Sequence, residues 1–383
     1  MIKMVLKYNT LGLIGGKIMV RIGIIGCGIM GKNHARSIWE GKVPNAELTA
    51  ICDIDPIQLE WATKNCPAEK EIKTFPTVTA LFDSGLIDAV LISTPHYDHP
   101  ILSIEAMEKN LHVMVEKPAG VYTKAVREMN DVAAKSDVIF AIMYNQRTHP
   151  MYRKMHEMVS DGNLGSIKRT SWLITDWYRP QAYYNGGGWR ATWKGEGGGV
   201  LINQCPHNLD LWQWICGMPK RVTAFAHQGK WHDIEVEDDV TAYVEYENGA
   251  TGIFVTSTAD CPGNNRFEVL GDKGKLVCEN GELVHYKLDI SEREFNNTNK
   301  EMFASPKVER IVVDCKGEYT EHPGVLVAFV NKILGKGELY AKGEEGINGL
   351  TISNAMHLSS WLGKTIELPF DEELFLSELQ KRQ

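Results

Sequence analysis

The chain has 383 residues, of which 43% are apolar and 23% are charged, an ordinary composition for a globular protein. This length predicts two domains with sizeable cores. The net charge of -8 does not favour a nucleic acid or an anionic membrane as a partner, and no apolar run is long enough to span a bilayer. The eight cysteines are scattered without a C-x-x-C pair, which argues against a metal site or a disulfide framework and favours the reducing cytoplasm.

Residues 1–18 do not fit the pattern that follows them. They have a weak apolar middle and no small-residue cleavage site, so they make a poor secretory signal. The segment Gly15-Gly16-Lys17-Ile18-Met19 reads as a translated ribosome-binding site before a start codon. We hypothesise that Met19 is the natural start and that residues 1–18 are a non-native or disordered extension.

A glycine-rich turn follows the first apolar run, residues 20–25. It reads Gly26-Cys27-Gly28-Ile29-Met30-Gly31, which fits G-x-G-x-x-G, and a helix is expected from residue 32 to about residue 40. In a dinucleotide site Gly26 permits the tight turn, Gly28 lets the pyrophosphate approach the backbone, and Gly31 lets helix and strand pack closely. Another α/β protein could also carry such a turn.

A second apolar run, residues 48–52, ends on Asp53, which lies 22 residues past Gly31. A carboxylate at this distance can accept both ribose hydroxyls of NAD, and it would repel the 2′-phosphate of NADP. The sequence therefore predicts an NAD site that includes Gly26, Gly28, Ile29, Met30, Gly31 and Asp53.

Strands and helices alternate from residue 20 to residue 143. Buried parallel strands are expected at residues 89–92, 112–115 and 138–143, and helices at residues 56–65, 100–109 and 123–136. This alternation predicts an α/β fold with a doubly wound parallel sheet, a Rossmann domain over residues 19–144.

The pattern changes after residue 144. A helix is expected at residues 150–159, a strand at 166–177 and a helix from about 200 to 216, followed by strands around the turns Asn248-Gly249 and Asn280-Gly281. Helices at residues 323–334 and 344–362 close the chain. We infer a second α+β domain over residues 145–383, with an open-faced, largely antiparallel sheet that serves substrate binding and oligomerisation.

Two polar segments follow expected strands of the first domain, at the edge where open α/β sheets bind ligands. Ser93-Thr94-Pro95-His96-Tyr97-Asp98-His99 follows one strand, and Glu116-Lys117-Pro118 follows the next. Lys117 could meet a substrate oxygen beside the nicotinamide, although a lone lysine is more often a solvated surface residue. We assign Thr94, Pro95, His96, His99, Glu116, Lys117 and Asn145 to the cofactor site.

A glycine-rich loop in the second domain leads to Asn203 and His207. The two lie four residues apart and share a helix face if the helix is continuous, which Pro206 makes doubtful. Histidine exchanges protons near neutral pH, but a hydrogen-bonded structural histidine is the plainer alternative.

An aromatic-dense stretch lies between these segments. It contains Trp172, Trp177, Tyr178, Tyr183, Tyr184, Trp189 and Trp193, with Arg179 and Arg190. Flat faces and donors suit a sugar ring, and a core or a subunit interface is the alternative. We assign Lys117, Arg147, Trp177, Tyr178, Trp189, Arg190, Asn203 and His207 to the substrate.

Together these motifs resemble the Gfo/Idh/MocA oxidoreductase family over nearly the whole chain from Met19. The resemblance rests on the glycine turn, Thr94-Pro95, Glu116-Lys117-Pro118 and the stretch leading to His207. The resemblance implies NAD(P)-dependent hydride transfer on a sugar, glycoside or cyclitol, with Lys117 and His207 as the catalytic pair. It also implies a homodimer or homotetramer.

This chain departs from the family where many members have Asp four residues before the histidine, because it has Asn203 there. Our expected mechanism has His207 as general base, Lys117 stabilising the developing negative oxygen, and Asn203 orienting the substrate or His207. Two alternatives remain: a glycoside-cleaving enzyme that keeps NAD bound for a transient oxidation, and a cofactor-sensing regulatory protein. The sequence does not name the substrate or the oxidised carbon.

Overall fold

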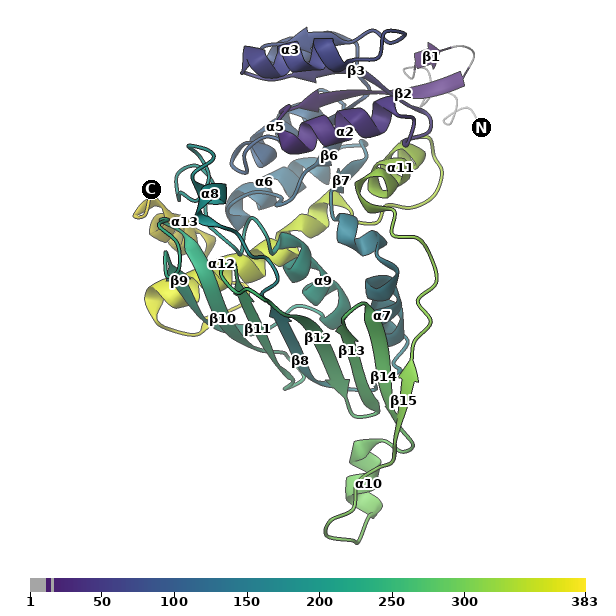
Figure 1. The fold of residues 1–383 in the computed structure, drawn as a ribbon, viewed down its shortest axis with the longest axis vertical. Coiled ribbons are helices and arrows are strands. Elements are labelled where there is room, and N and C mark those ends of the chain that lie inside the picture. The colour runs from purple at the N-terminus through teal and green to yellow at the C-terminus, as the bar shows by residue number, and fades with distance from the viewer. Residues whose placement is uncertain (1–11, 15–16) are drawn as a thin grey trace. The chain divides into compact units, whose positions relative to one another are not determined.

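The computed structural model describes residues 12–14 and 17–383, so most of the expected extension at residues 1–18 lies outside the described residues. The chain divides into two compact units (Figure 1). The first contains the chain up to Gly120 with Ala125–Asn145 and Thr320–Ile347, and the second contains Val121–Lys124, Gln146–Tyr319 and Asn348–Gln383. Within the described part of the chain, no helix is both long and apolar enough to cross a membrane.

The first unit is built on a parallel sheet whose strand order is β4-β3-β2-β5-β6-β7. The strands are β2 (Lys17–Ile25), β3 (Ala46–Cys52), β4 (Lys73–Phe75), β5 (Ala89–Ile92), β6 (His112–Val115) and β7 (Phe140–Ile142). The helices that connect them are α2 (Ile29–Trp39), α3 (Pro56–Asn65), α4 (Val78–Phe82), α5 (Asp98–Glu108) and α6 (Thr123–Ala133). The order reverses between β2 and β5, which is the switch point where such sheets bind dinucleotides.

A short strand, β1 (Gly12–Ile14), pairs antiparallel with the start of β2, with Gly12 opposite Met19 and Ile14 opposite Lys17. The described part of the expected extension therefore belongs to the first sheet.

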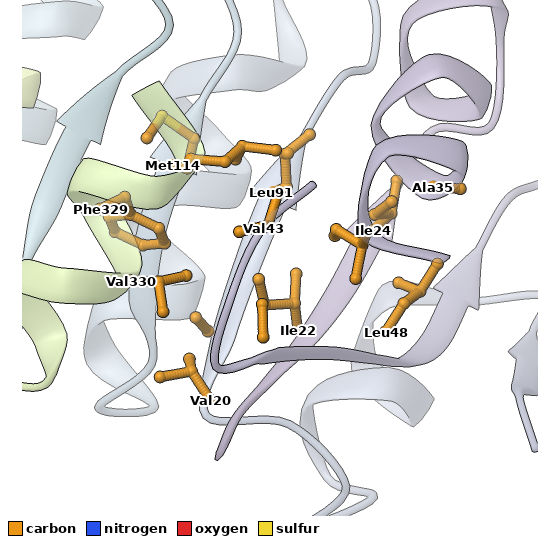
Figure 2. Packing of buried hydrophobic residues seen from close by; sticks show 14 of the residues in the cluster. Val20, Ile22, Ile24, Ala35, Val43, Leu48, Leu91, Met114, Phe329 and Val330 are labelled. Carbon is orange, nitrogen blue, oxygen red and sulfur yellow. The ribbon is translucent and has the colours of Figure 1, made fainter. Parts of the chain in front are cut away.

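Helix α11 (Glu321–Ile333) packs on this sheet although it comes from the last fifth of the chain. Its residues Phe329 and Val330 belong to the same buried cluster as Val20, Ile22 and Met114 (Figure 2). The sequence pattern predicts that all of residues 145–383 belong to the second domain. The apolar face of α11 instead packs against the parallel sheet of the first unit. Its local sequence does not indicate which of the two sheets it covers.

The second unit is built on a nine-stranded sheet with the order β15-β14-β13-β12-β8-β11-β10-β9-β16. All neighbouring strands are antiparallel except β8 and β11. The strands are β8 (Ile167–Ile174), β9 (Arg221–Gln228), β10 (Glu237–Glu245), β11 (Thr251–Ser257), β12 (Asn265–Gly271), β13 (Gly274–Glu279), β14 (Glu282–Leu288), β15 (Val308–Val312) and β16 (Ile366–Glu367). The predicted fold class, a Rossmann sheet followed by a largely antiparallel sheet, is confirmed.

Helices cover one face of this second sheet. They are α7 (Pro150–Ser160), α9 (Pro206–Cys216) and α12 (Gly346–Leu362). The shorter helices α8 (Gln181–Tyr184) and α13 (Glu372–Gln380) also belong to this unit, and α10 (Glu292–Thr298) connects β14 to β15. Trp212 of α9 stacks on Phe254 of β11 with ring centroids 5.3 Å apart. On the opposite face Phe225, Tyr243 and Ile253 are 63%, 42% and 40% exposed. This open face is defined by alternate residues of β9, β10, β11 and β8.

Candidate active site

The turn between β2 and α2 is closed on its inner side and open on its outer side. Gly26 has a φ of +86°, and a Cβ built there would lie 2.7 Å from the Ser93 carbonyl oxygen. A Cβ on Gly31 would lie 2.0 Å from the Gly26 carbonyl oxygen, so either side chain would displace backbone. A Cβ on Gly28 would meet no atom within 4 Å. The turn is tight where it packs and leaves room for a ligand beside Gly28.

The first turn of α2 adjoins this open position. Gly28 is its N-cap and has no side chain to accept from the first N–H groups. The next residue, Ile29, is 75% exposed, and Met30 is half-buried. Uncapped N–H groups at the positive end of a helix attract phosphate. Gly28, Ile29, Met30 and Gly31 can therefore hold a pyrophosphate through the backbone.

Asp53 lies at the carboxyl end of β3 and contacts this turn. Its Oδ2 accepts from the Cys27 N–H over 2.6 Å, and its Oδ1 accepts from the Asp55 N–H over 2.9 Å. A carboxylate has about four lone-pair sites, so it can accept further bonds from ribose hydroxyls. Asp55 caps α3 by accepting from the Ile57 N–H, which directs this second acid toward its own helix.

The segment after β5 is fixed to the glycine turn and to the segment after β6. The Ser93 hydroxyl donates to the Gly26 carbonyl oxygen over 2.7 Å. His99 is buried, and its Nδ1 lies 2.7 Å from the Pro118 carbonyl oxygen while its Nε2 lies 2.9 Å from the Thr94 carbonyl oxygen. Burial lowers the pKa of His99, although both carbonyl oxygens act to raise it. His99, which we had assigned to the cofactor, holds the two segments together, whereas Thr94 and Pro95 lie nearer the surface.

Glu116 is buried beneath the residue that follows it. Its Oε1 lies 2.7 Å from Nε2 of His34 on α2, and its Oε2 accepts from the Lys117 N–H over 3.2 Å. Burial acts to raise the pKa of Glu116, but the hydrogen bond and charge of His34, with His322 and Lys117, lower it to about 2. The ionised carboxylate thus fixes the main chain at Lys117, and Lys117 itself is half-buried after β6.

Asn145 and Arg147 follow β7 in a short 3-10 helix, η1 (Asn145–Thr148). Asn145 is buried, as is His96. Arg147 is also buried and makes a bidentate pair with Asp210 of α9, over 2.8 and 2.7 Å. The sequence analysis assigns Arg147 to the substrate, but its guanidinium instead binds the carboxylate of Asp210. The pair fixes α9, the helix that carries His207.

Helix α9 begins at Pro206, so the expected helix from residue 200 does not form. Proline is well suited to a first helical position, because it has no N–H to leave unpaired. Asn203 therefore lies in the preceding turn, where its side chain donates to the carboxylate of Glu196. His207 is the second residue of α9 and is 8% exposed. The two residues are neighbours in sequence but do not share a continuous helix.

The aromatic stretch divides into core residues and residues near the surface. Trp172, Tyr184 and Trp193 are buried. Tyr178 and Trp189 are 47% and 36% exposed, and Trp177 and Arg190 are half-buried. The Trp177 Nε1–H donates to Asn208, the residue after His207, over 3.3 Å. The four residues of this stretch that the sequence assigns to the substrate, Trp177, Tyr178, Trp189 and Arg190, all retain exposed surface.

Sequence reasoning did not find His34, Glu196 and His322. Glu196 is 2% exposed, and burial raises its pKa, against the lowering effect of the Ala191 N–H and Asn203. His322 of α11 lies with its ring centroid 5.7 Å from that of His34. Each of the three contacts a residue from another part of the fold, so its role cannot be read from its own sequence neighbourhood. His34 is the exception, because its position three residues past Gly31 places it on the inner face of α2.

Two family descriptions match the chain. The "Oxidoreductase family, NAD-binding Rossmann fold" matches residues 20–144, and the "GFO/IDH/MocA C-terminal domain" matches residues 152–277. The chain belongs to the Gfo/Idh/MocA family. The resemblance inferred from the motifs is thereby confirmed.

Three members of the Gfo/Idh/MocA family show which proteins this chain is similar to. The rhizopine catabolism protein MocA of Rhizobium meliloti is 30% identical over 51% of this chain and 57% of that protein. A myo-inositol 2-dehydrogenase of Thermotoga maritima is 27% identical over 68% of this chain and 75% of its own. The WlbA dehydrogenase of Bordetella pertussis, solved with NADH and UDP-GlcNAcA, is 25% identical with a TM-score of 0.76, covering 92% of this chain and 100% of its own.

The cofactor of this family member is NAD, and the residues of the first unit fit it. The open position at Gly28, the uncapped start of α2 and the carboxylate of Asp53 match the pyrophosphate and ribose. Within the described residues, no cluster of three His, Cys, Asp or Glu side chains is arranged to hold a metal ion.

Proposed function

We propose that this protein is an NAD-dependent dehydrogenase that oxidises a secondary hydroxyl of a sugar, glycoside or cyclitol, or reduces the corresponding ketone. One observation carries this function. Lys117 comes directly after β6, at the sheet edge that also carries the glycine turn after β2 and the Thr94 segment after β5. That edge is where a bound nicotinamide and a cationic side chain can serve the same substrate oxygen.

The residues of the first unit bind and orient. The glycine turn holds the pyrophosphate, Asp53 accepts from the ribose, and Thr94, Pro95, His96 and Asn145 line the nicotinamide end. When bound, NAD takes up the hydride that leaves the hydroxyl-bearing carbon. Lys117 stabilises the negative charge that develops on the oxygen, while Glu116 and His99 keep the main chain around it in place.

His207 accepts the hydroxyl proton as the general base. Its place in the first turn of α9 is fixed by the Arg147–Asp210 pair and by the bond from Trp177 to Asn208. Asn203, held by Glu196, orients the substrate or His207 through hydrogen bonds. The relatives that act on inositol support the substrate class, and the eight free cysteines support a reducing location such as the cytoplasm.

The open face of the second sheet supports a homo-oligomer, a dimer or a tetramer. Exposed apolar side chains on neighbouring strands make a patch that a second copy would cover.

The function is tested by following NADH formation with a panel of sugars, glycosides and inositols. His207→Ala should lower kcat by about 10²–10⁴-fold, the usual contribution of a general base, and leave NAD affinity unchanged. His227→Ala is the matched control, because His227 is an exposed histidine on β9 of the same unit. Full activity of His207→Ala, or no NADH with any polyol, would contradict the proposal.

A further inference from the structure

Two arginines of the aromatic stretch converge on one tyrosine. The Arg179 guanidinium carbon lies 5.2 Å from the centroid of the Tyr183 ring, and that of Arg190 lies 4.5 Å from it. The two cationic groups therefore lie within about 10 Å of each other, roughly the Debye length at 0.1 M salt, so they repel. Both side chains are half-buried, which weakens the screening of this repulsion by solvent.

Neither guanidinium makes a salt bridge among the described residues, although the charge of Arg190 reaches the buried carboxylate of Glu196 and acts to lower its pKa. That of Arg179 donates to the main-chain oxygens of Tyr178 and Trp177, over 2.8 and 3.5 Å, and that of Arg190 donates to the Tyr183 hydroxyl over 2.5 Å. Arg147 in the same unit, by contrast, has a bidentate carboxylate. Contacts with the rings of Trp177, Tyr183 and Trp189 offset part of the cost of holding two cations without a salt bridge.

The backbone that carries Arg179 is fixed from two sides. The Arg179 N–H donates to the Thr258 carbonyl oxygen over 2.8 Å, and the Arg179 carbonyl oxygen lies 2.9 Å from Nε2 of His232. Nδ1 of His232 in turn lies 2.9 Å from the buried carboxylate of Asp238. The guanidinium of Arg179 thus projects from a main-chain position that is set before any ligand arrives.

The arginine pair is attached to the segment around His207. The Tyr183 hydroxyl, which accepts from Arg190, also receives a weak contact from Gln204 at 3.5 Å, and Trp177 donates to Asn208. Gln204 and Asn208 lie on either side of His207 in the sequence. Within the second unit, the two cations and the exposed aromatic faces therefore belong to the surroundings of the proposed base.

We propose that the substrate is an anionic carbohydrate, whose carboxylate or phosphate binds Arg179 and Arg190 while its ring lies against the exposed aromatic side chains. The guanidinium fork matches the oxygen spacing of both groups, and an anion removes the repulsion between the two cations. Tyr178 and Trp189 offer flat faces to the sugar ring. This inference rests on the proposed dehydrogenase function and narrows its substrate class.

The test compares three sugars of the same ring, glucose, glucuronate and glucose 6-phosphate, as substrates with NAD and as ligands that raise the Tm of the protein with NADH present. We expect kcat/KM and the Tm shift to be largest for one of the two anionic sugars, and which one it is distinguishes a carboxylate from a phosphate. In Arg179→Gln/Arg190→Gln, KM for that sugar should rise about tenfold or more, with kcat within about threefold.

Arg169→Gln is the matched control, because Arg169 is an exposed arginine on β8 of the same unit. Arg179→Lys/Arg190→Lys keeps the charge and loses the fork, so its KM should fall between those of the parent and the Gln variant. Unchanged NAD affinity shows that the variants are folded. Equal preference for glucose, or an unchanged KM in the Gln variant, would overturn the inference and leave the dehydrogenase standing. Tm shifts by the anionic sugars that depend on the arginines, without NADH formation, would support the anion site and contradict the proposed reaction.

Discussion

Asp53 connects the end of β3 to the glycine turn, because its carboxylate accepts from the Cys27 N–H as well as from its own chain. The residue therefore has two duties, one in holding the turn and one toward the ribose. Replacing it by asparagine separates them, since an amide oxygen can still accept from Cys27 but carries no charge.

Asp53→Asn should raise the ratio of NADP to NAD turnover, measured as kcat/KM, by about tenfold or more. Two unit charges 4 Å apart repel by about 1–4 kcal/mol near a protein surface, and this variant removes that repulsion from the 2′-phosphate. Asp83→Asn, on the exposed surface of the same unit, controls for net charge. If Asp53→Asn and Asp83→Asn have the same cofactor preference, Asp53 does not face the ribose.

Single residues were predictable where short spacing encodes their role. The roles of Gly26 and Gly31 follow from the motif, and the local geometry of both glycines agrees with it. Arg147 and Asn203 were not predictable in the same way, because their partners Asp210 and Glu196 are brought to them by the fold. A single sequence gives the residue type but not the group that it faces.

Helices and strands were most predictable where the apolar pattern and the flanking turn residues indicate the same bounds. Helix α3 and strands β5 and β6 have the bounds expected from their apolar runs and flanking turns. The predicted start of α9, at about residue 200, was wrong because Pro206 is the first residue of the helix. Strands β9 and β12 and helix α13 were not predicted, because their short mixed segments lack a clear period.

Helix α11 should be required for the stability of the first unit. Phe329 is 1% exposed in the core of that unit, so Phe329→Ala should lower the free energy of unfolding by about 3–5 kcal/mol. NAD binding should be lost at correspondingly lower urea concentration. Ile57→Ala, at a 69% exposed position of α3, should change stability by less than about 0.5 kcal/mol. Equal stability of both variants would show that α11 does not complete this core.

The contact between His34 of α2 and Glu116, the residue after β6, should make the protein sensitive to acid. The pKa of Glu116 is about 2 in the fold against 4.5 ordinarily, so its stabilisation is present above pH 4.5 and is lost as the pH falls toward 2. The shift corresponds to about 3 kcal/mol. Urea unfolding from pH 7 to pH 2.5 measures this effect. The free energy of unfolding of Glu116→Gln should be lower than that of the parent above pH 4.5, and the two values should converge toward pH 2.5. Glu60→Gln, on the exposed surface of α3, is the control; a difference that does not change with pH would contradict this origin.

At the scale of the whole molecule, the exposed apolar patch on the second sheet should decide the assembly. We expect a dimer or tetramer by light scattering at micromolar concentration, and Ile253→Lys should reduce the mass toward that of a monomer by placing a charge among Tyr243 and Phe225. Ile57→Lys, on exposed α3, should leave the mass unchanged. A monomeric parent protein would contradict this expectation.

The return of the chain at Thr320–Ile347 has a consequence for how this protein is made and recombined. During synthesis the Rossmann sheet leaves the ribosome long before α11, so its core stays incomplete while the entire antiparallel sheet is being translated, although domains commonly fold as they emerge. For the same reason, a chimaera that joins residues 1–145 of one relative to the remainder of another would combine a sheet with a foreign α11. A chimaera that exchanges the cofactor-binding half must therefore also exchange Phe329 and its neighbours on α11, because they pack against the strands of that half.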